Sequence, residues 1–335
     1  MTCGARLSKT ANMINRKLVT PFFLILLFGS VALGQSPPDK IVITYPSRSI
    51  ASIDLYIAQE RGFFRQEGLQ ADLVQVRGNI AVTAILSGDA HAVNNVGTIM
   101  RAMERSEIPA KVVSQSLKKN LFWLVVKPEI KSIADLKGKT FGTTTFGGAQ
   151  HLAAARLFHK AGLDPDKDIT IIIGGDVPAQ LQSLVTGVIQ VAALSPPTVI
   201  VARDRFKLKI LANTIDDLPN LQNGLAVPEK LLRERRDLVK RILRARAKAN
   251  RYFFENERGA SEVLAAYLHV DLPVAVESYR LARPAFTVNG IPTDREIEEF
   301  LKADAELLKL REPVPPAKLF DFALQREVNQ ELGIK

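Results

Sequence analysis

Short polar loops follow four predicted strands, and they hold the residues best suited to binding a small molecule. These residues are mostly hydroxyl, amide or glycine residues, and the first turn of a helix leaves N–H groups unpaired with a partial positive charge. Such loops can hold an anionic or polar group without a cationic side chain. Ordinary helix capping is the alternative for each loop, since Ser, Thr and Asn are common caps. The candidate ligand-binding residues are Ser47, Arg48, Ser49, Asn95, Gly97, Thr98, Thr144, Thr145, Gly147, Gly148 and Ser195.

Arg48 is the single charged residue in these loops. Its guanidinium suits a bidentate clamp on a carboxylate or sulfonate, and a side chain that points to solvent is the equal alternative. Gly147-Gly148 lacks both the G-x-G-x-x-G spacing and the Gly-Lys-Ser/Thr ending of phosphate-binding loops. The sequence therefore predicts no nucleotide site.

The sequence offers little support for catalysis. Its four histidines are scattered, show no metal-ligand spacing, and stand at His91, His151, His159 and His269. No G-x-S-x-G nucleophile elbow is present. We predict no catalytic residue, no metal site and no cofactor, and we keep His151 as a possible ligand contact.

Residues 1–34 are typical of a secretory signal peptide. Four basic residues precede an apolar run over 18–33, and Ala32-Leu33-Gly34 places small residues at a cleavage site. The run is shorter than the ~20 residues of a membrane span, so a retained anchor is the less favoured alternative. Met13 is an alternative start. The chain's one cysteine, Cys3, lies in this segment, so the remainder has no thiol chemistry.

Composition indicates a globular protein with a modest positive charge. Hydrophobic residues make up 47% of the chain. Removing residues 1–34 removes four basic residues and no acidic residue, so the net charge falls from +10 to +6. No module for nucleic-acid binding is recognisable. The basic run over 230–251 predicts a surface helix with a solvated basic face, and a docking face is the alternative.

Strand and helix patterns alternate along the chain, which indicates an α/β architecture with mostly parallel sheets. We predict that the chain is mainly helical from residue 221 onward. The order helix, glycine stop, strand and helix start occurs around Gly88 and again around Gly187, which suggests two similar lobes. The predicted strands are 41–45, 71–76, 90–93, 112–115, 121–126, 140–143, 169–173 and 188–194.

The stretch Leu55–Leu69 (LYIAQERGFFRQEGL) resembles an element of the periplasmic substrate-binding proteins for sulfonates, taurine, nitrate and thiamine precursors. Ala84–Asp89 and Ile133–Gly142 match the same family. The resemblance implies the two-lobed periplasmic binding protein fold of type II, with a mostly parallel sheet flanked by helices in each lobe and two hinge crossings. The implied division is a signal peptide over 1–34, lobe 1 over 39–125, lobe 2 over 126–215, and a return to lobe 1 with C-terminal helices over 216–335.

The resemblance also implies a function. The protein would be a periplasmic monomer that captures a small organic, anionic ligand between its lobes and delivers it to an ABC permease. A sulfonate, a carboxylate or a heterocycle would be the ligand, and neither nucleic acid nor a membrane span would be involved after cleavage. A secreted enzyme on the same fold and a sensory module that presents ligand to a receptor are the alternatives.

Overall fold

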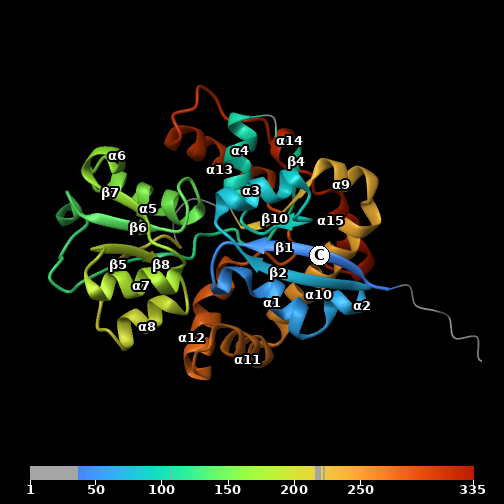
Figure 1. The fold of residues 1–335 in the computed structure, drawn as a ribbon, viewed down its shortest axis with the longest axis horizontal. Helices are drawn as coiled ribbons and strands as arrows, with labels where there is room; N and C mark the ends of the chain where they lie inside the picture. The colour runs from blue at the N-terminus through green and yellow to red at the C-terminus, as the bar shows by residue number, and fades with distance from the viewer. Residues whose placement is uncertain (1–36, 107, 216–219, 222) are drawn as a thin grey trace, which may run out of the picture. The chain divides into compact units, whose positions relative to one another are not determined.

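The computed structural model describes residues 37–106, 108–215, 220–221 and 223–335. The predicted signal peptide, its cleavage site and Cys3 lie outside the described residues. Two five-stranded sheets organise the described part (Figure 1). No described helix is both long and apolar enough to cross a membrane.

The first sheet has the strand order β2-β1-β3-β10-β4. β1 is parallel to β2 and β3, and β10 is antiparallel to both of its neighbours. Four of the five strands therefore point the same way. The strands are β1 (Asp39–Tyr45), β2 (Leu69–Gln75), β3 (Ala92–Val93), β4 (Ala110–Gln115) and β10 (Gly224–Pro228).

The second sheet repeats this arrangement with the order β7-β6-β8-β5-β9. β6 is parallel to β7 and β8, and β5 is antiparallel to β8 and β9. The shared order confirms the two similar lobes that the sequence predicts. The strands are β5 (Trp123–Val126), β6 (Thr140–Thr143), β7 (Thr170–Ile173), β8 (Val191–Leu194) and β9 (Lys209–Asn213).

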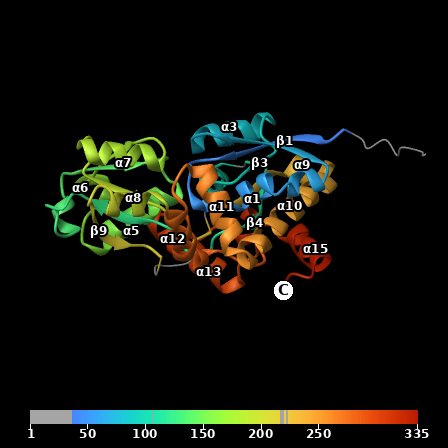
Figure 2. The same ribbon diagram turned by 90° about the horizontal axis from the view of Figure 1, so that it is seen from below.

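Helices cover both faces of the first sheet, because successive strand residues point to opposite faces. In β10, Leu225 and Val227 pack with α1 (Ile53–Glu60) and α10 (Arg236–Glu255). Ala226 belongs to the cluster on the other face, with side chains of α3 (Gly78–Ser87), α4 (Val96–Arg105) and α13 (Asp294–Leu307). Figure 2 shows α3 on one side of β1 and α1 on the other.

The second sheet is covered in the same way. Val191 and Ala193 of β8 pack with α5 (Ala149–Lys160), and Ala192 and Leu194 pack on the opposite face. That face carries α7 (Val177–Thr186) and α8 (Thr198–Asp204). The remaining elements are η1 (Ile50–Ser52), α2 (Phe63–Gln66), η2 (Ala134–Leu136), α6 (Pro165–Asp168), α9 (Glu229–Glu234), α11 (Glu257–Leu268), α12 (Leu272–Ala282), η3 (Arg283–Ala285), α14 (Pro316–Leu319) and α15 (Ala323–Leu332).

Two sequence predictions differ from the structure. The boundary at residue 125 falls inside β5, because β5 pairs within the second sheet and the chain leaves the first sheet after Gln115. The list of predicted strands lacks β9, and in the region after residue 221, which is mainly helical as predicted, it lacks β10. The core of β10, Leu225-Ala226-Val227, is too short for its periodicity to distinguish a strand from a helix.

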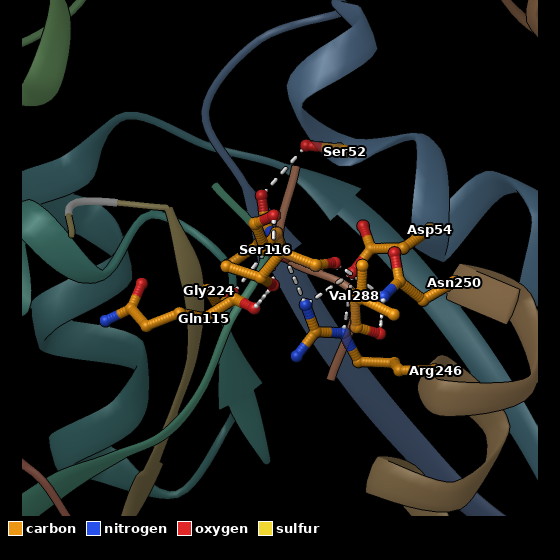
Figure 3. A network of polar contacts seen from close by, with 10 residues as sticks. Ser52, Asp54, Gln115, Ser116, Gly224, Arg246, Asn250 and Val288 are labelled. Carbon is orange, nitrogen blue, oxygen red and sulfur yellow. Dashed lines mark hydrogen bonds and ion pairs between the residues drawn. The ribbon is translucent and has the colours of Figure 1, made fainter. Parts of the chain in front are cut away.

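The chain passes between the sheets after β4 and again after β9, and the described residues of the two crossings, 116–122 on one side and 214–215, 220–221 and 223 on the other, are hydrogen-bonded to each other. Ser116 N donates to Asn223 O at 2.9 Å, and Phe122 N donates to Thr214 Oγ1 at 3.3 Å. A buried ion pair holds the start of the first crossing: Arg246 Nε donates to Asp54 Oδ2 at 3.0 Å, and Ser116 Oγ donates to the same oxygen at 3.1 Å. Figure 3 shows Asp54, Ser116 and Arg246 pointing toward one another from three segments of the chain.

Candidate functional site

The loops at the carboxyl ends of strands in the two sheets contact each other directly. In open α/β sheets this is the edge at which ligands bind. Ser47, which follows β1, accepts a hydrogen bond from Val177 N at 3.1 Å, and Ile50 N donates to Pro196 O at 3.2 Å. Loops that follow β1 in one sheet and β7 and β8 in the other therefore meet.

A second contact between the sheets forms at the start of α3. Gly78 N donates to Thr145 Oγ1 at 3.2 Å. A Cβ at Gly78 would lie 2.5 Å from Thr98 Oγ1 and 2.9 Å from Thr145 Cγ2, so only glycine allows this approach. A Cβ at Gly148, which precedes α5, would lie 3.3 Å from Thr145 O and 3.9 Å from Thr98 Oγ1.

Asp176 joins these contacts with its carboxylate. It caps α7 by accepting from Ala179 N at 3.1 Å. It also accepts from Arg48 Nε at 3.4 Å and from Gln75 Nε2 at 3.2 Å, which come from the first sheet. Arg48 is thus half exposed and ion-paired, so it does not stand as an uncompensated cation.

The remaining predicted residues have local roles. Ser49 Oγ caps η1 by accepting from Ala51 N at 3.3 Å. Asn95 Nδ2 donates to Thr98 Oγ1 at 3.2 Å, and α4 begins at Val96, so Gly97 and Thr98 lie in its first turn. Thr144 N donates to Gln150 Oε1 at 2.7 Å.

Gly147 is the predicted residue that these contacts do not include. Its N–H donates to His151 Nδ1 at 2.9 Å, and its α-carbon lies beside Arg101. Burial lowers the pKa of His151, so the ring is neutral at pH 7, and the accepting Nδ1 places its proton on Nε2.

Two buried hydroxyls at the strand ends have no hydrogen-bond partner among the described residues, Thr44 Oγ1 and Ser195 Oγ. Thr44 is 2% exposed and lies near the end of β1, and Ser195 is 1% exposed and directly follows β8. A buried hydroxyl without a partner costs free energy, and native structures rarely leave one without a reason. A bound ligand that pairs with these hydroxyls would supply that reason.

Three tyrosines pack together at the end of β1. Tyr45, the last residue of β1, meets Tyr56 edge to face at 5.8 Å, and Tyr56 stacks on Tyr267 of α11 at 3.7 Å. Burial raises the pKa of Tyr45 and raises that of Tyr267 to about 12, so both phenols stay protonated at neutral pH. The tyrosines therefore form a neutral, packed cluster next to the end of β1.

Four residues of this region were not predicted from the sequence: Thr44, Gln75, Gly78 and Asp176. Thr44 was counted only as part of a strand, although it stands at the strand's carboxyl end. The role of Asp176 as a helix cap could have been predicted, because Gly174-Gly175-Asp176 precedes Val177-Pro178, the pattern of a cap followed by proline in the first turn. Gln75 and Gly78 had none, because their contacts come from the other sheet.

We refer to Thr44, Ser47–Ser49, Asn95–Thr98, Thr144, Thr145, Gly148 and Ser195 as the strand-end site. It contains hydroxyls, amides and helix N-termini, and its one formal cation is paired. No group of His, Cys, Asp and Glu among the described residues could hold a metal ion. The chemistry that the site offers is hydrogen bonding to a polar or anionic molecule.

Comparison with known proteins gives one family and several structural relatives. A family model described as NMT1/THI5 like matches residues 49–260. The putative binding protein YtlA of Bacillus subtilis is 28% identical over 155 residues, which cover 44% of this chain and 46% of YtlA. The matched region thus spans about half the length of this curated relative.

Solved structures share the fold at low sequence identity. A protein of Bordetella bronchiseptica RB50 is 19% identical, with a TM-score of 0.77 over 89% of this chain and 100% of its own. The alkanesulfonate-binding protein SsuA of Xanthomonas axonopodis pv. citri, bound to MOPS, is 16% identical, with a TM-score of 0.69 over 88% and 99%. The desulfurization enzyme DSZB is 15% identical, with a TM-score of 0.62 over 88% and 99%. These likenesses establish the two-lobed α/β fold of periplasmic binding proteins.

Proposed function

The chain belongs to the NMT1/THI5-like family, and from this premise and the strand-end site we propose that it is a periplasmic solute-binding protein. It captures a small organic anion at the strand-end site and delivers it to an ABC importer. The observation that carries the proposal is the meeting of polar loops from both sheets at the ends of strands, where Thr44 and Ser195 have buried hydroxyls without a partner.

The ligand class follows from the chemistry of the site. Helix N-termini and hydroxyls suit the oxygens of a sulfonate or carboxylate, because they donate hydrogen bonds without a full positive charge. SsuA, which shares the fold, is described as alkanesulfonate-binding. A sulfonate is therefore the first candidate, followed by a carboxylate and a polar heterocycle.

The mechanism is closure of the two sheets on the ligand. The described residues of the two crossings, 116–122 and 214–215, 220–221 and 223, act as the hinge, and the ligand touches loops from both sides. A ligand favours the closed arrangement only through the contacts that it makes there and not in the open one. The protein acts as a monomer, is exported by a cleaved signal peptide, and carries out no reaction on the ligand.

A thermal-shift screen of the purified protein tests the proposal, with MOPS, taurine, benzoate, nitrate and uracil as probes. A compound that binds only the folded state raises the melting temperature. Calorimetry with the best probe should then show that Thr44→Val, Asn95→Ala and Thr145→Ala each weaken binding at least about fivefold, the loss of about one hydrogen bond.

Thr186→Ala is the matched control, because Thr186 is exposed and its hydroxyl bonds within α7. It should leave binding unchanged, and circular dichroism should show all four variants folded. Unchanged affinity in all three site variants would refute the assignment of the site. Turnover of a probe would favour the alternative of a secreted enzyme, for which the shared fold with DSZB is the motivating observation.

A further inference from the structure

A cavity lies between α4, α5 and the end of α13, and its lining includes Phe146, Gly147 and His151. Its volume is about 320 Å³, the size of a small-molecule site. Its lining comes from both sheets' helices, α4 on one side and α5 and α6 on the other. We call it the α4–α5 cavity.

Cationic side chains outnumber acidic ones in the lining. Arg105 and Lys309 contribute positive charge, and Asp166 is the one carboxylate. The Lys309–Asp166 pair is long, at 3.8 Å, and both side chains are largely exposed. Arg105 has no ion pair among the described residues, so its guanidinium is available to an anion.

Arg101 also lines the cavity, but its charge is already used. Arg101 Nη1 lies 2.7 Å from both carboxylate oxygens of Glu104, and its Nη2 pairs with Asp304. Arg101 is 6% exposed. Arg101 is therefore a buried, ion-paired part of the lining, and Arg105 remains the cation that a ligand could bind.

An aromatic wall stands next to these cations. Phe146 is 55% exposed, an unusual position for a large apolar ring, and it meets the His151 ring edge to face at 5.8 Å. Leu152, Ala155 and Pro165 extend the apolar lining. His151 Nε2 carries a proton, because Nδ1 accepts from Gly147 N.

We propose that the α4–α5 cavity is a second binding site, for a small anion that carries an aromatic ring. The ring packs on Phe146, and the anionic group pairs with Arg105 while His151 and His159 donate hydrogen bonds. Aromatic rings prefer edge-to-face or offset arrangements at such distances, and a guanidinium binds carboxylate or sulfonate in a planar, bidentate way. This inference does not depend on the function proposed for the strand-end site.

Occupation of the cavity would also affect the relation between the two sheets. A molecule that contacts Arg105 on α4 and Phe146 in the loop before α5 touches both sides at once. It would stabilise the arrangement of the sheets seen here by the extra contacts that it makes in it.

The four histidines of the chain provide a direct test. We would add benzenesulfonate to the purified protein and follow the ring proton–nitrogen signals of all four histidines by NMR. The signals of His151 and His159 should shift in a saturable way, and those of His91 and His269 should not. Benzyl alcohol, which has the ring without the charge, should bind at least about fivefold more weakly, the loss of about one ion pair.

Variants separate this site from the strand-end site. Arg105→Gln and Phe146→Ala should each weaken the response of His151 and His159 at least about fivefold. The control Arg258→Gln, at an exposed arginine of α11, and Thr44→Val should leave it unchanged. No shift at about 10 mM benzenesulfonate, where even a Kd near 1 mM would show, would overturn the proposal.

A response abolished by Thr44→Val but unaffected by Arg105→Gln and Phe146→Ala would also overturn it, because the probe would then occupy the strand-end site. In another outcome, Thr44→Val, Asn95→Ala and Thr145→Ala all leave the affinity of every probe unchanged while the His151 and His159 signals still shift with benzenesulfonate. That result would refute the proposed function and would leave the α4–α5 cavity as a binding site.

Discussion

The ion pair between Asp54 and Arg246 joins three distant segments through one carboxylate. Both residues are 4% exposed, and Ser116 Oγ completes the coordination of Asp54 Oδ2. A buried pair of this kind adds little net stability compared with apolar residues, but removal of one partner leaves an uncompensated charge. The pair matters for function because Ser116 begins the crossing from the first sheet to the second.

We expect Arg246→Met to lower the free energy of unfolding by about 3–5 kcal/mol, because Asp54 loses its counterion in a buried place. Urea denaturation measures the loss. The double variant Asp54→Leu/Arg246→Met should lose less than the single variant, and Arg258→Met, at an exposed position, should change stability by less than about 0.5 kcal/mol. A loss below about 1 kcal/mol for Arg246→Met would contradict a buried pair.

Most residues of the strand-end site could be predicted individually, because small hydroxyl and amide residues between a strand and a helix are readable in one sequence. Their partners could not be predicted. Thr145 bonds to Gly78 N, and Ser47 accepts from Val177 N, over separations that no local pattern records. The placement of Gly147 beside His151 rather than among the contacts of the two sheets was equally hidden.

At the scale of elements, α10 was predicted correctly as a helix, but the contacts of its basic face were predicted incorrectly. The run over 230–251 was predicted to be a surface helix with a solvated basic face, and most of it lies in α10. Arg244 and Lys248 instead pair with Glu67, and Arg241 pairs with Asp39. The acidic partners lie on other elements, so the helix's own sequence could not reveal that these basic residues form ion pairs within the molecule.

A buried charge cluster connects α4, α5 and α13. Asp304 pairs with Arg101, and Asp304 Oδ1 lies 3.9 Å from Arg156 Nη2 on α5. Burial raises the pKa of Asp304, and that of Glu104 beside it, despite the nearby arginines. A carboxyl with a raised pKa stabilises the folded state at low pH, and this contribution is lost as the pH rises through the folded-state pKa.

We expect the stability of Asp304→Asn relative to the wild type to rise as the pH increases from about 4 to about 7, because asparagine has no proton to lose in the buried cluster. Urea denaturation at several pH values measures this change.

Glu331→Gln provides a control of opposite sign. Hydrogen bonds from Lys240 and Arg244 lower the pKa of Glu331, so its contribution is present at neutral pH and lost on acidification. Its variant should lose stability relative to the wild type as the pH rises. If the stability difference from the wild type changed with pH in the same direction for both variants, burial would not be the dominant influence on the pKa of Asp304.

At the scale of the whole molecule, Asp176 is the residue through which several parts of the two sheets are connected. Its carboxylate caps α7 and accepts from Arg48 and Gln75 of the first sheet. These links are partly exposed, so each contributes less than about 1 kcal/mol. In the proposed mechanism these links favour one position of the two sheets relative to each other and add little to the stability of the fold.

We expect Asp176→Ala to broaden the distance between the sheets and to shift it to longer values, because three links to α7 and the first sheet are lost. Spin labels on Ser87→Cys and Thr186→Cys, at the ends of α3 and α7, report this distance by pulsed electron resonance.

Asp164→Ala is the matched control for the loss of a helix cap, since Asp164 caps α6 by accepting from Asp166 N of the same helix. Both variants should lose about 1 kcal/mol of stability through their caps. An unchanged distance distribution in Asp176→Ala would show that the links do not bias the sheets.

The sequence by itself determined the α/β class, the repeated lobe and the polar character of the strand ends, because periodicity, glycine stops and capping residues are local signals. Only the tertiary structure decided the order of the strands in each sheet and the place of β10 in the first sheet. It alone also showed that Asp176 and Gly78 connect the loops of the two sheets next to the strand-end site. Contacts between residues about 65 to 190 positions apart depend on how whole elements pack, and side-chain packing leaves no periodic mark along a chain.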